Sequence, residues 1–351
     1  MNISITNACN RRCKYCFQRD WYLSKKAGID GDDSVREIDP EDFRALLRWA
    51  GEISNFKIMG GEPLLHSKLP ELLSIAAEEE KKLTLISNIS AKPVQFDRIL
   101  PYCAGGSQPN VISGSLINTD YPKNQSILFK RNLDLLASTK IGISLGTTLL
   151  PHAPVKPIIE RMKELASIYC RRRGSVDGLA IRLAPFCPNP TDSTRFKLYD
   201  FSNDIVNLIN GLADTGIKDY RFDCPVNYCE VSDDFVDACR QLAIGIKTER
   251  CSPDSGMPFD VLTDRSVVWC SSATFLRLDD WKAFRNYAEA RRALSAQYYL
   301  WWRTHGLNPE CRSCDKHNPG LCLGFCIAKT AHLNRFPIPV NPALKDINNA
   351  V

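Results

Sequence analysis

The sequence has few histidines and no long hydrophobic run. Its five histidines are scattered, and no two of them stand at the spacing of a metal-binding pair. No apolar run reaches the roughly 18 residues that a membrane-spanning helix needs, and Met1 is followed at once by a strand pattern instead of a charged and then apolar leader. We therefore expect a cytoplasmic protein with no membrane partner.

The sequence also lacks an excess of charge of one sign. Its 45 Lys and Arg residues nearly balance its 40 Asp and Glu residues, which leaves a net charge of +5. A nucleic-acid-binding protein usually concentrates basic residues on one face, and this balance gives no support for such a partner. We also find no phosphate-binding loop and no hydrolytic triad, so the sequence does not favour a function that depends on either.

Cysteine, by contrast, is abundant. The chain has 15 cysteines, an odd number, in a sequence without a leader. Such a composition indicates reduced thiols and metal binding instead of a disulfide scaffold. Three of them, Cys9, Cys13 and Cys16, fall in one loop directly after residues 2–6, whose alternating pattern predicts a strand.

These three thiols fit an iron-sulfur cluster better than a zinc ion. Structural zinc sites usually have four Cys or His ligands, and the nearest histidine, His66, is about fifty residues away. A cluster held by three cysteines leaves one iron with an open coordination position, where a substrate or cofactor can bind. The loop therefore predicts a catalytic metal centre, with buried thiols of purely structural role as the alternative.

The spacing CxxxCxxC, with Tyr15 just before the third cysteine, resembles the signature of the radical S-adenosylmethionine (radical SAM) enzymes. In that family the loop carries a four-iron, four-sulfur (4Fe-4S) cluster, and the amino and carboxylate groups of S-adenosyl-L-methionine chelate the open iron. The resemblance implies that Cys9, Cys13 and Cys16 are the cluster ligands and that Tyr15 packs near the adenine.

A second motif, Gly60, Gly61, Glu62 and Pro63, follows the next predicted strand. Glycines at a strand end let the backbone approach a ligand closely. The motif resembles the GGEP motif of the same family, and the resemblance implies that Gly60, Gly61 and Glu62 hold the methionine ammonium end of the cofactor. Taken alone, two glycines and a proline also fit a plain turn.

Strand and helix patterns alternate along the first part of the chain. The expected strands are residues 2–6, 56–59, 83–87, 111–117, 141–145 and 179–183, and the expected helices are residues 40–50, 67–82, 94–102, 125–137, 155–172 and 201–213. Such alternation predicts parallel strands with right-handed crossovers. We therefore expect an α/β fold, a partial (β/α)6 TIM-like barrel, which matches the family. Chemistry in such barrels lies at the carboxyl ends of the strands.

Further polar residues at these strand ends are candidates for contacts with the cofactor. They are Ser87, Asn88, Ser113, Ser115, Asn118 and Arg182, of which we favour Asn88, Ser115 and Arg182. Arg182 lies in an otherwise apolar strand and needs an anion or several acceptors, because an unpaired buried charge is costly. That anion is the carboxylate of the cofactor or substrate, or an acid of the barrel in a structural ion pair.

Regular alternation ends near residue 216, and cysteines become frequent again. We predict a core domain at residues 1–216, a smaller cysteine-rich domain at residues 217–335 and a loosely ordered tail at residues 336–351. The smaller domain contains a predicted hairpin at residues 261–269 and a long predicted helix at residues 279–302, whose aromatic residues we expect to form a packing surface.

Six C-terminal cysteines carry the other specific pattern. They are Cys251, Cys270, Cys311, Cys314, Cys322 and Cys326. Their order resembles the auxiliary-cluster domains called SPASM and Twitch, which follow the barrel in many radical SAM enzymes. The resemblance implies at least one auxiliary iron-sulfur cluster. A full SPASM domain has a further cysteine after the CxxxC, and this chain has none beyond Cys326.

The ligands of the auxiliary site stay open. The Twitch arrangement would use the first four of the six C-terminal cysteines for one cluster. Alternatively, the last two take part, with Cys224 or Cys229 recruited into one of two clusters. Zinc is a further alternative, because four thiolates suit either metal.

The resemblance implies a radical SAM enzyme that reductively cleaves S-adenosyl-L-methionine to a 5′-deoxyadenosyl radical and abstracts hydrogen from a peptide or small-molecule substrate. The outcome would be an oxidation, a cross-link or another modification, with electrons from a donor such as flavodoxin or ferredoxin. The alternatives are a non-catalytic iron-sulfur or zinc binding protein and a radical SAM methyl or sulfur transferase.

Overall fold

Parallel strands joined by helices make up most of the structure. The computed structural model describes residues 1–13, 16, 35–183, 200–222, 224, 226, 231–241, 253, 259–270 and 273–305. Several predicted site residues lie outside the described residues, namely Tyr15, Cys229, Cys251, Cys311, Cys314, Cys322 and Cys326. The predicted tail at residues 336–351 lies outside them as well.

The described strands form a ten-stranded sheet in the order β10-β9-β8-β1-β2-β3-β4-β5-β6-β7. From β1 to β7, every neighbouring pair is parallel. The strands are β1 (Asn2–Thr6), β2 (Asn55–Gly60), β3 (Lys82–Ser87), β4 (Ile112–Asn118), β5 (Gly142–Leu149), β6 (Gly178–Leu183), β7 (Tyr220–Phe222), β8 (Asp260–Val261), β9 (Val267–Val268) and β10 (Arg277–Leu278). Spatial order therefore follows chain order from β1 to β7.

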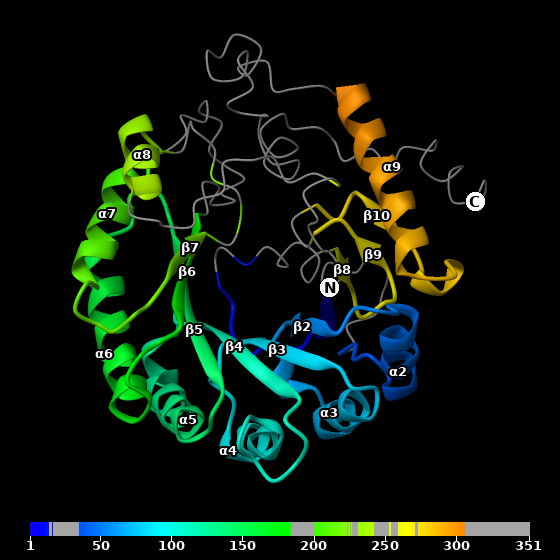
Figure 1. Cartoon of the computed structure of the whole chain (residues 1–351), viewed down its shortest axis with the longest axis horizontal. Coiled ribbons are helices and arrows are strands. Elements are labelled where there is room, and N and C mark those ends of the chain that lie inside the picture. The colour runs from blue at the N-terminus through cyan, green and yellow to red at the C-terminus, as the bar shows by residue number, and fades with distance from the viewer. Residues whose placement is uncertain are drawn as a thin grey trace.

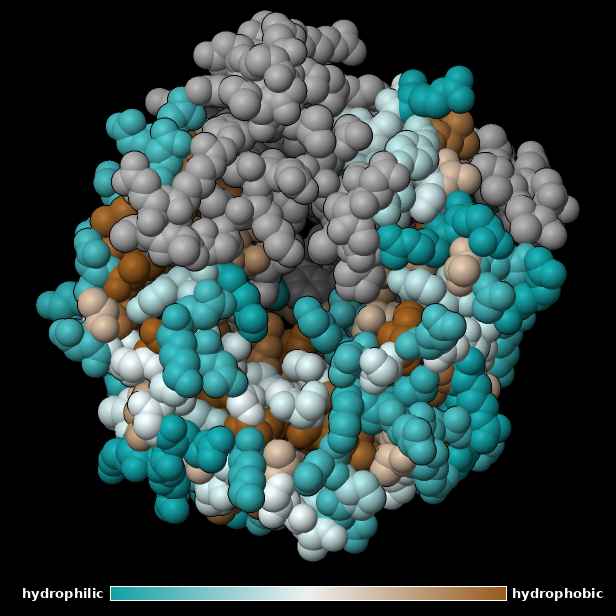
Figure 2. All heavy atoms as spheres, in the orientation of Figure 1, coloured by the Kyte–Doolittle hydropathy of each residue, from teal (hydrophilic) through white to brown (hydrophobic). Residues whose placement is uncertain are grey.

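Helices lie around the outside of the curved sheet (Figure 1). They are α2 (Pro40–Trp49), α3 (Leu69–Glu78), α4 (Pro93–Phe96), α5 (Ser126–Ser138), α6 (Lys156–Arg173), α7 (Ser202–Gly211), α8 (Asp233–Gln241) and α9 (Tyr287–His305). Short 3-10 turns are η1 (Pro63–Leu65), η2 (Asp97–Tyr102), η3 (Lys123–Gln125) and η5 (Trp281–Ala283). Figure 2 shows a mostly hydrophilic outer rim over α3, α4 and α5, with hydrophobic residues visible nearer the centre.

Helix α2 illustrates how the sequence places these elements. The side chain of Asp39 accepts a hydrogen bond from the backbone N–H of Glu41, and Pro40 takes the first helical position. Phe43, Leu46 and Leu47 then recur at helical spacing and are fully buried. One apolar stripe thus fixes which side of α2 packs on the sheet.

The α/β class and the parallel sheet predicted from the sequence are confirmed. The sheet nevertheless continues past residue 216, because β7 pairs with β6 in parallel. This strand has only three residues, too few to show a period. The predicted strand at residues 141–145 also runs four residues further, to Leu149.

Two predicted helices were wrong in extent. The segment at residues 94–102 holds only the single turn α4 and the 3-10 turn η2, which contains Pro101 and therefore lacks one backbone donor. The helix predicted at residues 279–302 begins only at Tyr287. Asn286 precedes it and accepts a hydrogen bond from the backbone N–H of Glu289, in the manner of an N-terminal cap.

The predicted hairpin at residues 261–269 is confirmed, and it joins the sheet at β1. Strands β8 and β9 are antiparallel, while β8 runs parallel to β1 on the side opposite β2. Strand β1 is thus flanked on both sides. The aromatic residues of the following segment do pack, since Trp281, Tyr298 and Trp301 are buried. No helix in the described ranges has the length and apolar character needed to cross a membrane.

Helix α2 also holds the C-terminal elements against the N-terminal ones. The indole N–H of Trp49 donates to the carbonyl oxygen of Phe284 over 2.8 Å, and its ring lies 5.4 Å from that of Trp281. Asp42 accepts hydrogen bonds from Arg265, at 2.8 Å, and from Lys282. These contacts join residues more than 220 positions apart.

We expect Asp42→Asn to lower the free energy of unfolding by about 1 kcal/mol at neutral pH, a modest value because the pair is partly exposed. Burial raises the pKa of Asp42, but the hydrogen bonds from Lys282 and Arg265 outweigh it and hold the pKa below its ordinary value. The contribution of ionised Asp42 to the free energy of unfolding is therefore complete above about pH 4, and it is lost as the pH falls through the lowered pKa of Asp42.

Chemical denaturation of the wild type and Asp42→Asn at pH 7 and at about pH 3 measures this difference. Glu41→Gln is the matched control, because that exposed side chain stands one residue away on the same helix. An undiminished difference at the lower pH would contradict the assignment to Asp42.

Candidate active site

The loop with Cys9, Cys13 and Cys16 begins at the carboxyl end of β1, near the middle of the sheet. None of the three is in a disulfide; Cys9 is exposed, and Cys13 and Cys16 are partly exposed. The backbone N–H of Cys16 donates to the carbonyl oxygen of Cys13 over 3.2 Å, which links the second and third cysteines directly. The structure therefore places the predicted ligands where the chemistry of a parallel α/β fold is expected.

Gly60 and Gly61 let the end of β2 touch the start of this loop. The backbone N–H of Gly61 donates to the carbonyl oxygen of Thr6 over 2.8 Å, and that of Glu62 donates to the carbonyl oxygen of Ala8 over 2.7 Å. A Cβ at Gly60 would lie 2.3 Å from the oxygen of Thr6, and one at Gly61 would lie 2.1 Å from that of Ala8. No larger residue fits either contact, so the two glycines hold the cysteine loop in place.

The side chain of Glu62 is also engaged within the protein. It is 1% exposed, and its carboxylate accepts hydrogen bonds from the hydroxyl of Ser87 and from the backbone N–H groups of Leu64 and Asn88. Burial raises the pKa of Glu62, and these hydrogen bonds oppose the effect. Glu62 thus ties the end of β2 to the end of β3, and its predicted contact with the cofactor remains a prediction.

Arg11, inside the cysteine loop, is the residue that the sequence did not single out. Its side chain is only 8% exposed. The guanidinium donates to the carbonyl oxygens of Asn88, Asn118 and Asp120, the hydroxyl of Ser90 and the side-chain oxygen of Gln125. These acceptors follow β3 and β4 and precede α5, so one buried cation fastens the cysteine loop to two neighbouring strand ends.

Asn10 adds neutral hydrogen bonds to the same region. Its side-chain oxygen accepts from the side chain of Asn88 over 2.9 Å, its side-chain nitrogen donates to the carbonyl oxygen of Ser90, and its own carbonyl accepts from Gln125. Asn88, predicted as a cofactor contact, therefore lies against the cysteine loop. Its side-chain amide already serves to position that loop.

The thiols influence one another electrostatically. The pKa of Cys9 is raised to about 12. The largest cause is burial of its thiol among neighbouring atoms, although the residue as a whole is exposed. The charges of Glu62, Cys13 and Cys16 also raise this pKa, and a hydrogen bond from the backbone N–H of Arg11 lowers it. Forming thiolates here requires a cation close by. Iron supplies one, so the donor set fits an iron-sulfur cluster.

Within the described ranges, no three His, Cys, Asp or Glu side chains converge on one ion position. The ligands of a 4Fe-4S cluster bind to different irons, so three cysteines can hold one without such convergence. The cluster ligands Cys9, Cys13 and Cys16 remain a prediction from the sequence, as does the auxiliary site. Of the six C-terminal cysteines, only Cys270 lies in the described part of the chain, and it is partly exposed.

The remaining predicted contacts lie on different faces of the sheet. Ser115 pairs in register with Leu85 and Ile143, two core residues, and its hydroxyl donates to the carbonyl oxygen of Leu85 over 3.1 Å. It therefore faces the helices, and the structure does not bring it to the inner face. Arg182 pairs with Thr148 and alternates with the core residues Ile181 and Leu183, which places it on the inner face.

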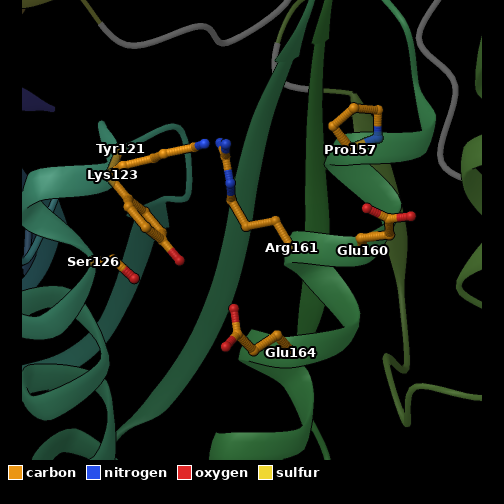
Figure 3. A pocket seen from close by; sticks show the side chains of 7 residues that line it. All are labelled: Tyr121, Lys123, Ser126, Pro157, Glu160, Arg161 and Glu164. Atoms are coloured by element: carbon orange, nitrogen blue, oxygen red, sulfur yellow. The ribbon is translucent and has the colours of Figure 1, made fainter.

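A surface hollow of about 430 Å³ lies between the start of α5 and helix α6. Figure 3 shows Arg161 and Glu164 rising from α6 and Lys123 reaching toward them from the segment before α5. Glu164 is paired with Lys130, and Arg161 lies 5.1 Å from the ring centre of Tyr121. Glu164 and Arg161 therefore have partners within the protein.

Comparisons with known proteins agree with the motifs. Residues 3–105 match the family model described as the radical SAM superfamily. A GTP 3′,8-cyclase of Chlorobaculum tepidum is 34% identical over 158 residues, which are 43% of this chain and 44% of the relative. A GTP 3′,8-cyclase of Syntrophomonas wolfei is 34% identical over 80 residues, 22% of each chain. The matched part spans less than half the length of either relative.

Solved structures share the fold. The structure titled native anSMEcpe with bound AdoMet has a TM-score of 0.58 at 13% identity, over the whole length of both chains. Streptococcus suis SuiB bound to S-adenosylmethionine has a TM-score of 0.54 at 14% identity, over 93% of this chain and 73% of SuiB. The match over residues 3–105 agrees with the resemblance to radical SAM enzymes seen in the motifs, and the solved structures agree with the fold. The comparisons do not test the predicted auxiliary domain.

We expect Gly61→Ala to lower the free energy of unfolding by about 2–4 kcal/mol, since its Cβ would overlap the carbonyl of Ala8. It should also lower the iron bound per chain after anaerobic reconstitution. Gly114→Ala is the matched control, because the nearest atom to a Cβ there is 3.7 Å away. Equal iron contents in the two variants would argue against the role given to Gly61.

We expect Arg11→Met to cost about 2–4 kcal/mol of stability, because it leaves several buried oxygens without a donor. Thermal unfolding of the metal-free protein measures this loss independently of any cluster. Arg12→Met, at the exposed neighbouring position, should have little effect. If both variants melt at the same temperature, the Arg11 hydrogen bonds do not hold the loop.

Proposed function

We propose that this chain, whose residues 3–105 match the radical SAM superfamily, binds a 4Fe-4S cluster through Cys9, Cys13 and Cys16 and uses S-adenosyl-L-methionine to abstract hydrogen from a peptide or small molecule. The net outcome is an oxidation, a cross-link or another modification. The observation that carries the proposal is the cysteine loop itself: three cysteines outside any disulfide follow one strand end, and Arg11 and the backbone of Gly61 and Glu62 fix the loop there.

The bound group would supply the radical chemistry: a reduced cluster cleaves S-adenosyl-L-methionine, and the 5′-deoxyadenosyl radical takes a hydrogen atom from the substrate. The protein's part is to bind, orient and exclude water. Cys9, Cys13 and Cys16 would hold three irons and leave the fourth open. Tyr15, Gly60, Gly61, Glu62, Asn88 and Arg182 remain the proposed cofactor contacts.

In the described structure, Glu62 and Asn88 also brace the loop from the neighbouring strands. A fixed loop is what this chemistry requires, because a reactive radical must form at a constant distance from the hydrogen that it takes. The hydrogen bonds of Arg11 serve the same end from the ends of β3 and β4. The geometry thus supports a site that is shaped before the cofactor binds.

Both substrate classes have support. The matched relatives are named GTP 3′,8-cyclase, whereas the structures with similar folds include SuiB bound to its precursor peptide and anSMEcpe bound to a peptide. A likeness at about 14% identity speaks only for the fold. An auxiliary iron-sulfur cluster on the six C-terminal cysteines, an electron donor such as flavodoxin or ferredoxin, and a cytoplasmic location complete the proposal.

Anaerobic reconstitution with iron and sulfide, followed by reduction with dithionite in the presence of S-adenosyl-L-methionine, tests the proposal. We expect the wild type to form 5′-deoxyadenosine, measured by chromatography. Cys9→Ala, Cys13→Ala and Cys16→Ala should each reduce its formation at least about a hundredfold, because a missing ligand removes the cluster. Cys103→Ala, at a buried thiol outside the loop, should keep most of the activity.

A cluster-loaded wild type that forms no 5′-deoxyadenosine would refute the radical SAM function. Iron in the Cys9, Cys13 and Cys16 triple variant reports on the auxiliary site separately. If iron-sulfur absorption persists in that variant, the C-terminal cysteines bind a cluster. Zinc in place of iron would favour the structural alternative.

A further inference from the structure

The inner face of β5, β6 and β7 carries small residues and two arginines. In the sheet register, Ala180 of β6 pairs with Gly146 of β5 and with Arg221 of β7. Residues paired across parallel strands point to the same side. Leu179 and Ile181, the neighbours of Ala180, belong to the core packed on the helices, so this row points to the opposite, inner side.

Arg221 lies across this row. Its guanidinium donates to the hydroxyl of Ser144 over 2.9 Å, and Ser144 stands on the same inner face, two residues before Gly146. Gly146 and Ala180 leave room for the guanidinium, since neither has a side chain longer than a methyl group. Arg221 is nevertheless an exposed residue, and its printed partner is a neutral hydroxyl.

Three exposed arginines of the described structure have carboxylate partners, unlike Arg221. Arg48 is paired with Glu79, Arg131 with Asp97 and Arg172 with Asp134, each at 3.0 Å or less. Within the described residues, no carboxylate forms an ion pair with Arg221. A guanidinium held by a hydroxyl on an inner sheet face keeps most of its donors for another acceptor.

Arg182 stands next to it on the same face. It follows Ala180 by two residues and pairs with Thr148, while Ala180 pairs with Arg221. With strands about 4.8 Å apart and a rise of about 3.3 Å per residue, the Cα atoms of Arg182 and Arg221 lie about 8 Å apart. Arg182 therefore adds a second positive charge to the face on which Arg221 lies.

We propose that Arg221 binds an oxyanion of the substrate, a carboxylate or a phosphate. The forked guanidinium matches the paired oxygens of both groups. The inference rests on the proposed function and specifies its substrate class. We assign the anion to the substrate because β7 is the last strand of the parallel series, whereas the cysteine loop and its supports follow β1 to β4.

Calorimetric titration of the reconstituted protein, saturated with S-adenosyl-L-methionine, tests this site. GTP and tripolyphosphate probe the phosphate source, and a triglutamate peptide probes the carboxylate source. We expect at least one probe to bind the wild type and to bind Arg221→Gln at least about tenfold more weakly. Arg221→Lys should lie between them, because it keeps the charge and loses the fork.

The control is Arg172→Gln, the same substitution at an exposed arginine on α6, outside the sheet. It should leave probe binding unchanged. If no probe distinguishes the wild type from Arg221→Gln, the proposal is wrong. A loss of S-adenosyl-L-methionine affinity in Arg221→Gln as large as the loss of probe affinity would also overturn it, because the anion would then be that of the cofactor.

Formation of 5′-deoxyadenosine without substrate separates the two proposals. Arg221→Gln should match the wild type in this reaction, since the residue acts on the substrate. A loaded wild type that forms none refutes the proposed function, while the titrations still decide whether the inner face binds an oxyanion. A melting temperature of Arg221→Gln within a few degrees of the wild type shows that the variant is folded.

Discussion

The buried guanidinium of Arg11 determines the shape of the cysteine loop. A cation that is 8% exposed needs acceptors, and here they come from the chain after β3, the chain after β4 and the start of α5. Such acceptors meet at one place only because neighbouring parallel strands end at the same edge of the sheet. The thiols on either side of Arg11 are thereby held at that edge.

The backbone contact between β1 and β2 completes this support from the other side. Gly61 and Glu62 donate to carbonyl oxygens of the segment that leads into the loop, and the absence of side chains at Gly60 and Gly61 permits the approach. The carboxylate of Glu62 then reaches the end of β3. Three successive strands therefore share one hydrogen-bonded network, in which main-chain groups and side chains serve equally.

Local features of this design could be predicted from the sequence, and long-range ones could not. The cysteine spacing, the glycine pair and the alternation of strands and helices are local patterns. The first two lie at strand ends as predicted, and the alternation holds apart from the extent of two helices and the added strand β7. The role of Arg11 depends on acceptors 77 to 114 residues away. The face of Ser115 was missed because both faces of its strand mix polar and apolar residues, so the alternation does not mark the buried side. Arg221 was missed because β7 has only three residues, and the roles of the cysteines still await experiment.

The pairing of β8 with β1 leaves one edge of β1 exposed during synthesis of the chain. Strand β1 leaves the ribosome before the other described strands, but one of its two edges is covered only when Asp260 and Val261 arrive. At about 5–20 residues per second, that edge stays open for roughly ten to fifty seconds. An open strand edge invites pairing with other chains. Slow translation or an early stop would therefore harm this protein before any active site exists.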